Sequence, residues 1–191
     1  MHLRGHNVRW AYTMEGNSLS VDETEKDLGI WISSDMKCSD QCLYAFNKAS
    51  KVTGMIKKTI KHKEAGIMVS LYKTLIRPYV EYCVSAWSPY YKKDKELLEK
   101  VQRRFTKMIV NMEGLSYEER LRRLKLWTLE ERRNRQNLIE VFKISQGKSI
   151  IGHQDLFALD NNNNGTRGHT LKLSKMRCTR DCRRYFFLIE W

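Results

Sequence analysis

Metal-dependent phosphate chemistry needs paired carboxylates, and the acidic residues of this chain do not form such pairs. Two-metal catalysis places two ions about 4 Å apart between adjacent acidic side chains. No Asp-Asp dipeptide occurs in the sequence, and the pairs Glu118-Glu119 and Glu130-Glu131 stand where helices are expected to begin. The sequence also has no Gly-rich phosphate loop, no Gly-x-Ser-x-Gly and no His-Glu-x-x-His. We therefore expect no catalytic residues, no metal site and no other cofactor in this chain.

The cysteines are the next residues that could do chemistry. Cys38 and Cys42 stand four residues apart, as do Cys178 and Cys182. Four thiolates could bind zinc, but structural zinc sites typically use pairs separated by two residues. Small buried side chains are the alternative that we favour, and Cys83 is expected in the core. Five cysteines also argue against a disulfide framework and for a reducing compartment.

Lysine and arginine offer chemistry of another kind, which is the binding of phosphates. The 191 residues include 35 basic and 22 acidic side chains, a formal charge of +13. Residues 1–36 carry a net charge of −3, whereas 37–77 and 92–148 carry +7 each and 165–191 carry +5. Such a surface attracts polyanions, so nucleic acid is the first partner class to test. A lysine-rich surface that only solvates helices is the alternative.

These charges must be positioned by helices, because apolar residues recur three and four apart over long stretches. The period predicts helices over 39–60, 63–77 and 94–112, and Pro78 should end or kink the second. The aromatic-rich segment 79–87 is expected in the core. The inward residues predicted for the second helix are Ile67, Met68, Leu71, Tyr72 and Leu75.

Shorter elements flank these helices. Two strands, 8–14 and 18–21, are expected around a turn at Glu15-Gly16-Asn17-Ser18, and 28–32 is a further strand candidate. Capping boxes at Ser116 to Glu119 and Thr128 to Glu131 predict a helical hairpin, whose second helix ends at Gly147. Residues 160–165 are predicted to form a turn or linker, 169–175 a strand and 183–187 the approach to an apolar end.

Aromatic residues allow two interpretations. They could stack on nucleic-acid bases, or they could be buried among apolar neighbours. Their helical spacing favours burial. These residues are Tyr72, Tyr79, Tyr82, Trp87, Tyr90 and Tyr91. Basic helix faces are the stronger indication, because a ridge of lysine and arginine can follow the phosphates of a duplex without reading its sequence.

Five ordered segments resemble one family. They are KDLGIWISSDMK (Lys26 to Lys37), LYKTLIRPYVEYCVSAWSPYYKKD (Leu71 to Asp94), LLEKVQRRFTKMI (Leu97 to Ile109), GLSYEERLRRLKLWTLEERR (Gly114 to Arg133) and TRGHTLKL (Thr166 to Leu173). Together they resemble the region beyond the polymerase palm in reverse transcriptases of LINE-type, jockey-like retrotransposons without long terminal repeats. The resemblance covers nearly the whole chain.

The resemblance implies a fold and a role. In that family the palm carries a Phe-Ala-Asp-Asp box for two Mg²⁺ ions, and this chain corresponds to the part after that box. Leu28, Gly29 and Ile30 resemble the primer-grip hairpin, and the following helices resemble the thumb and connection that hold the template–primer duplex. The backbone contacts expected on this basis are Lys48, Lys51, Lys58, Lys61, Arg77, Arg103, Arg104 and Lys107.

We therefore expect a mainly α fold, a helical thumb-like bundle behind a small antiparallel β hairpin, with a short β-containing C-terminal extension. The expected regions are a primer-grip-like segment (1–36), a helical domain (37–148), an Asn-rich linker (149–165) and a basic C-terminal segment (166–191). The expected function is to hold RNA, DNA or an RNA–DNA hybrid, without polymerising alone, and a palm is the expected partner in cis or in trans.

The alternative function is that of a remnant or domesticated module that binds RNA nonspecifically or binds another protein, without enzyme activity. No apolar run approaches the roughly 20 residues that span a bilayer, and no secretion signal is recognisable. We expect no membrane or small-molecule partner, and a nuclear or cytoplasmic location.

Overall fold

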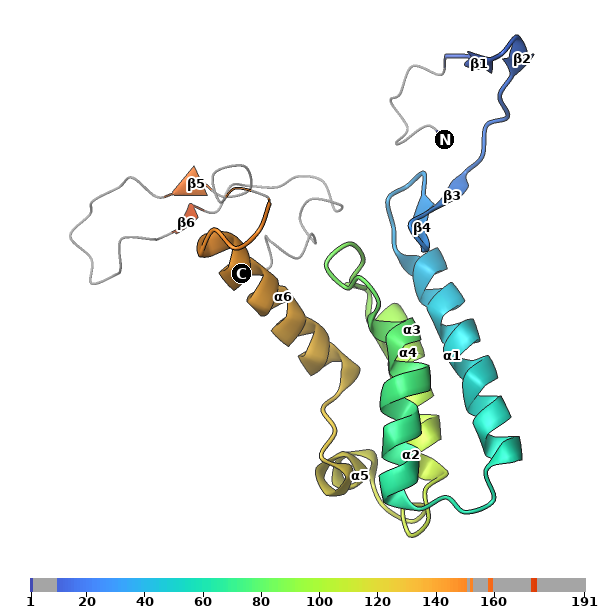
Figure 1. The fold of residues 1–191 in the computed structure, drawn as a ribbon, viewed down its shortest axis with the longest axis vertical. Coiled ribbons are helices and arrows are strands. Elements are labelled where there is room, and N and C mark those ends of the chain that lie inside the picture. Colours follow the sequence, from blue (N-terminus) through green and yellow to red (C-terminus); the bar gives the residue numbers. More distant parts are fainter. Residues whose placement is uncertain (2–9, 151, 153–157, 160–172, 175–191) are drawn as a thin grey trace, which may run out of the picture. The chain divides into compact units, whose positions relative to one another are not determined.

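The computed structural model describes residues 10–150, together with Met1, Gly152 and the segments 158–159 and 173–174. The described part is mainly helical, with small antiparallel hairpins before the helices, as the sequence predicts (Figure 1). The chain divides into two compact units, residues 1–132 and 133–191. None of the described helices is both long and apolar enough to cross a membrane.

The first hairpin joins β1 (Thr13–Met14) to β2 (Asn17–Ser18). The predicted turn is confirmed, but its left-handed positions are Glu15, with φ 51°, and Gly16, with φ 81°. Positive φ at both central residues matches the right-handed twist of a two-residue hairpin. Asn17, which we expected in the turn, already pairs with Met14. Residues 8 and 9 of the predicted first strand lie outside the described residues.

A second hairpin joins β3 (Thr24–Asp27) to β4 (Ile30–Ser33). The predicted strand 28–32 is therefore wrong at its start, because Leu28 and Gly29 form the turn with φ 45° and 87°. The residues expected to resemble a primer grip are two turn residues, Leu28 and Gly29, followed by Ile30, the first residue of β4. β3 escaped prediction because all four of its residues are exposed and give no alternation of apolar and polar side chains.

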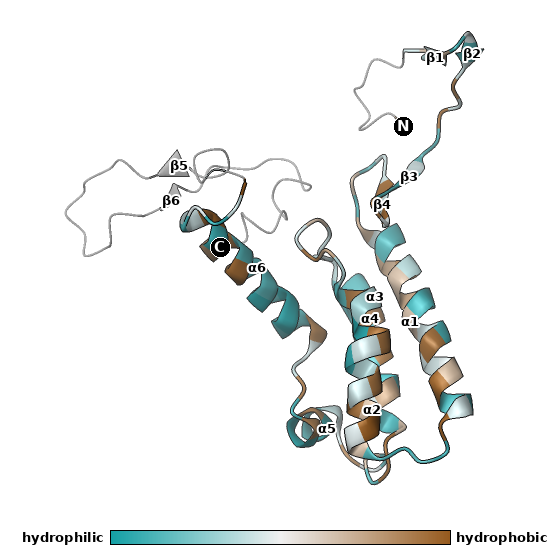
Figure 2. Ribbon diagram, viewed as in Figure 1, coloured by the Kyte–Doolittle hydropathy of each residue, from teal (hydrophilic) through white to brown (hydrophobic). Residues whose placement is uncertain are grey.

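Two long helices run parallel to each other, α1 (Ser39–Thr59) and α4 (Lys92–Lys107). Near their N-terminal ends the Ser39 hydroxyl donates to the Asp94 carboxylate at 2.8 Å. Beyond their C-terminal ends the Val110 amide donates to the Lys63 carbonyl at 3.0 Å. The segments α2 (Ala65–Leu71), η1 (Tyr72–Ile76) and α3 (Arg77–Glu81) run in the opposite direction (Figure 1). Figure 2 shows apolar stretches beside polar ones on these helices, as expected of an amphipathic bundle.

The second helix continues further than predicted, and the side chains that it buries are not all the predicted ones. The chain stays helical through Pro78, because one π turn precedes it and Pro78 lies in the first turn of α3, where no amide donor is needed. Ile67 and Leu75 are 50% and 42% exposed instead of inward. Two adjacent rows of this helical segment, each with a spacing of four residues, are both apolar. The helical period alone could therefore not show which of the two rows is buried. The buried row is Met68, Tyr72, Ile76 and Val80.

The aromatic segment is only partly core. Val84 and Trp87 are buried, and the Trp87 indole donates to the Tyr82 carbonyl at 2.7 Å. Tyr79 and Tyr82 are exposed, which corrects their predicted burial. Cys83 is exposed too, contrary to prediction, because it sits at φ 50° in the turn that follows α3.

The remaining elements follow the predicted capping boxes. α5 (Tyr117–Leu124) begins where the Ser116 hydroxyl accepts from the Glu119 amide at 3.2 Å. α6 (Leu129–Ser145) begins where the Thr128 hydroxyl accepts from the Glu131 amide at 3.2 Å. Gly147 follows α6 with φ 64°, as a helix end requires.

The third predicted helix and the C-terminal elements differ in extent. α4 ends at Lys107, before the predicted Met112, although Ile109 and Met112 stay buried. In the C-terminal extension, β5 (Ala158–Leu159) pairs with β6 (Leu173–Ser174). The predicted linker at 160–165 and the segment 183–187 lie outside the described residues.

Candidate nucleic-acid interface

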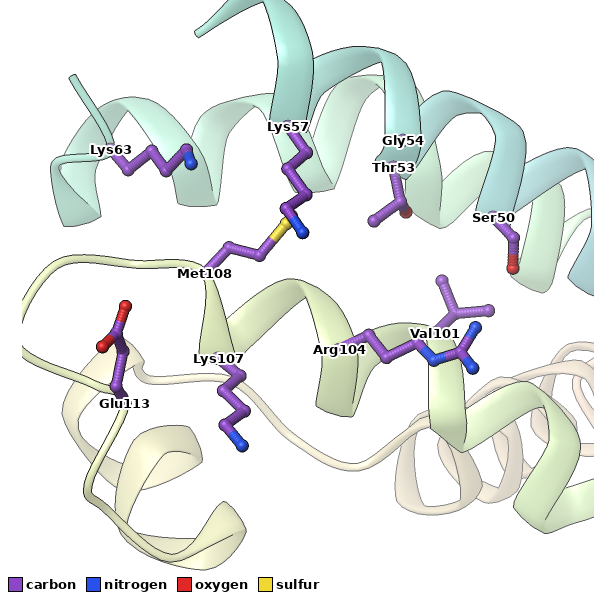
Figure 3. Close-up of a pocket in the computed structure, with 10 residues that line it drawn as sticks. All are labelled: Ser50, Thr53, Gly54, Lys57, Lys63, Val101, Arg104, Lys107, Met108 and Glu113. Carbon is purple, nitrogen blue, oxygen red and sulfur yellow. The ribbon is translucent and has the colours of Figure 1, made fainter. Parts of the chain in front are cut away.

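A groove of about 530 Å³ lies between α1 and α4, near their C-terminal ends (Figure 3). The groove is partly open to solvent. We call it the basic groove. Its lining residues are Ser50, Thr53, Gly54, Lys57, Lys63, Val101, Arg104, Lys107, Met108 and Glu113.

The basic groove is strongly cationic. Four of its lining side chains are lysine or arginine, and Glu113 is its one carboxylate. Figure 3 shows Lys57 and Arg104 reaching into the space between the two helices, from opposite walls. Positive charges with few acidic neighbours suit an anion, and the planar guanidinium of Arg104 suits a phosphate.

Small and polar residues on α1 keep the groove open. Ser50, Thr53, Gly54 and Lys57 fall on one face of α1, since they recur three and four residues apart. The Thr53 hydroxyl donates to the Ala49 carbonyl at 2.8 Å. A Cβ added at Gly54 would meet no atom of a neighbouring element within 4 Å. Ser50, Thr53 and Gly54 are small residues and therefore leave space between α1 and α4.

Gly54→Ala is expected to stabilise the protein by about 1 kcal/mol, because glycine in a helix interior costs about that much relative to alanine. Gly54 does not need a positive φ, and an added Cβ meets no neighbour. Urea unfolding of the two proteins measures the difference. A loss of stability would show that the groove wall at Gly54 is packed rather than open.

Basic residues of α4 form a ridge that continues from the groove. The ridge consists of four exposed residues, Lys93, Lys100, Arg104 and Lys107. Because they are spaced by seven, four and three residues, they lie on one side of the helix. The rise of 1.5 Å per residue spaces neighbouring charges by about 4 to 11 Å along the axis. Spacings of this size can match successive phosphates of one strand.

The basic residues predicted from the sequence do not form one surface. Arg104 and Lys107 line the groove. Lys51 and Lys58 are exposed on the side of α1 away from the core, and Lys61 lies just beyond the helix. Two further predicted cations lie over tyrosine rings, since Lys48 stands 5.6 Å from the Tyr44 ring and Arg103 stands 5.0 Å from the Tyr117 ring.

Arg77 is the predicted contact that the structure turns inward. Its Nε lies 3.8 Å from a carboxylate oxygen of Glu81, and its side chain is 18% exposed. Glu81 also accepts two hydrogen bonds from Arg132, at 2.5 and 2.8 Å. Burial and the nearby Arg132 lower the pKa of Arg77. Arg77 therefore belongs to a structural ion cluster, and we leave it out of the interface proposed below.

Four basic residues of the groove and ridge escaped prediction, namely Lys57, Lys63, Lys93 and Lys100. Lys57 lies next to Lys58, and a helical wheel centred on the buried Ala49 and Ile56 would have placed it at the edge of the core. Lys63 stands in the connection after α1, where no period applies. Lys93 and Lys100 precede Arg104 by eleven and four residues, a signal that was present in the sequence.

A buried polar network fixes α4 against the chain that follows it. The Tyr72 hydroxyl donates to Gln102, whose amide donates to the Tyr117 hydroxyl at 3.0 Å and to the Trp127 carbonyl at 2.9 Å. Tyr117 donates to Glu99, which also accepts from the Leu129 amide at 3.0 Å. Sequence analysis missed this network, because none of these side chains belongs to a recognisable motif. It positions the helix that carries the basic ridge.

The network makes stability depend on pH in the alkaline range. Burial raises the pKa of the Tyr72 hydroxyl well above its usual value, and the Glu81 carboxylate raises it further. Burial and the hydrogen bond to Glu99 raise the pKa of Tyr117 as well. A raised pKa in the folded state means that this stability is fully present below pH 10 and is lost above it, by up to about 1.4 kcal/mol per pH unit for each tyrosine.

Urea unfolding between pH 8 and pH 11.5 should therefore show a free energy of unfolding that falls steeply above about pH 10. Tyr72→Phe should be less stable at pH 8, because Gln102 loses its donor, but should show a shallower alkaline fall. Equal alkaline slopes in the two proteins would show that Tyr72 ionises as easily in the folded state as in the unfolded one.

Metal binding finds no support in the part of the chain that the structure covers. That part brings no three potential ligand side chains of His, Cys, Asp or Glu together. Cys42 is buried and Cys38 half-buried, whereas Cys178 and Cys182 lie outside the described residues.

Comparisons with known proteins identify no relative. No family model matches the chain, no curated protein matches it, and no solved structure matches it.

Proposed function

We propose that this chain binds the phosphate backbone of nucleic acid, as the thumb-like part of a reverse transcriptase from a retrotransposon. The basic groove between α1 and α4 is the observation that carries this proposal. Four cations and one carboxylate line it, and the ridge on α4 extends it by Lys93 and Lys100. A groove of this kind supplies affinity from phosphate contacts and no reading of base sequence.

The segments that resemble jockey-like reverse transcriptases supply the proposed context. In that context the ligand is an RNA–DNA hybrid, and the catalytic carboxylates and their Mg²⁺ ions belong to a palm that acts in cis or in trans. The chain alone would hold the duplex without extending it. Such a protein would work in the nucleus or the cytoplasm.

A protein-interaction module is the second candidate, and exposed apolar residues on one helical side favour it. Ile67, Leu75 and Tyr79 recur at intervals of four or eight residues along α2 to α3, and each is at least 42% exposed. Exposed apolar surface of this kind commonly marks a contact with another protein. In the proposed context a palm would cover it.

Fluorescence anisotropy with a labelled 12-base-pair RNA–DNA hybrid and with each single strand tests the proposal. We expect the hybrid to bind more tightly than either strand, because two strands present more phosphates to the groove and ridge. Binding that is weak and equal for all three ligands would favour the protein-interaction module.

A further inference from the structure

A second cationic site lies where the hairpin of β3 and β4 packs against α1. The rings of Trp31 and Tyr44 meet edge to face, with centroids 6.2 Å apart. Two ammonium groups lie over the Tyr44 ring, that of Lys26 at 5.1 Å and that of Lys48 at 5.6 Å from its centroid. We call these four residues the Tyr44 patch.

The Tyr44 patch is distinct from the basic groove. Lys48 stands nine residues before Lys57 on the same helix. At 100° per residue, nine residues place the two side chains on opposite sides of α1. A variant in one site therefore leaves the other site intact.

The backbone holds the patch in place before any ligand binds. Lys26 and Trp31 are directly paired across β3 and β4. The Trp31 amide donates to the side chain of Gln41 at 3.0 Å, and Gln41 is 3% exposed. The Lys26 ammonium lies 3.4 Å from the Tyr44 hydroxyl. The hairpin and α1 are thus joined at this point by polar contacts as well as by ring contacts.

We propose that the Tyr44 patch binds an unpaired nucleotide, whose base stacks on Tyr44 and whose flanking phosphates contact Lys26 and Lys48. This inference rests on the proposed function, because it names a ligand of the same nucleic acid. Tyr44 and Trp31 are half-buried, whereas Lys26 and Lys48 are exposed. A base can therefore replace the lysine ends over the ring, while the ammonium groups move to the phosphates.

The combination of residue types points to an unpaired base rather than to a duplex. A paired base hides both of its faces in the stack, so a duplex offers the patch phosphates alone. Single-strand sites instead combine an aromatic platform with cations that follow the backbone. Every base has a π face, so the patch would accept any base.

The test compares an eight-nucleotide thymidine strand with an abasic phosphodiester strand of equal length and charge, by anisotropy at about 0.1 M salt. We expect the wild-type protein to bind the thymidine strand about tenfold more tightly, because stacking is lost with the bases. Tyr44→Leu should abolish this difference, and Tyr44→Phe should keep it. Tyr79→Leu is the matched control, since Tyr79 is an exposed tyrosine outside the patch, and it should keep the difference.

The outcomes separate the two proposals. Equal binding of the two strands by wild-type protein would overturn the Tyr44 patch and leave the basic groove standing. Failure to bind either strand or the hybrid would overturn both. If a folded Tyr44→Leu protein still binds the thymidine strand more tightly than the abasic strand, the stacking site is not the Tyr44 patch and the proposal is wrong. If Tyr44→Leu does not fold, equal binding of the two strands by the wild-type protein still overturns the patch, and a difference that Tyr44→Phe and Tyr79→Leu both keep supports it.

Discussion

Replacing Lys57, Arg104 and Lys107 together by glutamine is expected to lower the affinity for an RNA–DNA hybrid about 100-fold at 0.1 M salt. All three side chains line the basic groove. Each phosphate contact releases about one counterion, so their loss should also reduce the slope of log K against log salt concentration by about three. Anisotropy titrations at several salt concentrations measure both quantities.

The matched control removes three positive charges elsewhere. Arg122, Arg123 and Lys125 are exposed and lie at the end of α5 or just after it, outside the groove lining. Replacing these three by glutamine changes the net charge equally, so a purely global attraction would weaken binding by the same factor in both variants. Equal losses would contradict the assignment of binding to the groove.

Glu81→Gln is expected to destabilise the protein by about 3 kcal/mol, because removing one partner of a buried ion cluster leaves its other charges uncompensated. The side chain of Glu81 is 6% exposed and is bound by Arg132 and Arg77. We expect a destabilisation at the low end of that usual for a broken buried ion pair, because the Arg132 side chain is 25% exposed and remains partly solvated. The hydrogen bond to Glu81 raises the pKa of Arg132, which agrees with a strong pairing.

Urea unfolding measures this loss, with Glu130→Gln as the matched control. Glu130 binds Lys95 at 2.8 Å, but its side chain is 55% exposed. An exposed pair of this kind contributes less than about 1 kcal/mol. A similar loss in the two variants would contradict the structural role assigned to the Glu81 cluster.

The helices could be predicted because each buries one continuous stripe. α1 shows Cys42, Ala45, Ala49 and Ile56 on one face, and its predicted extent differs by one residue from the observed one. The starts of α5 and α6 could be predicted because capping is local, so Ser116 and Thr128 act within three residues of themselves.

Features that depend on tertiary contacts could not be predicted. β3 has no buried residue, and the choice between two apolar rows in α2 to α3 depends on which row meets α1 and α4. Arg77 resembles an exposed cation in the sequence, and only its contact with Glu81 shows that it points inward. The groove brings together Lys57 and Arg104, which stand 47 residues apart in the sequence, and no local pattern encodes that proximity.

The salt dependence of hybrid binding by the wild-type protein tests the central claim most directly. The groove and ridge offer six cations, namely Lys57, Lys63, Lys93, Lys100, Arg104 and Lys107. About six phosphate contacts should give a slope near −5 for log K against log salt concentration. A slope near zero, with affinity unchanged between low and high salt, would contradict binding through the phosphate backbone.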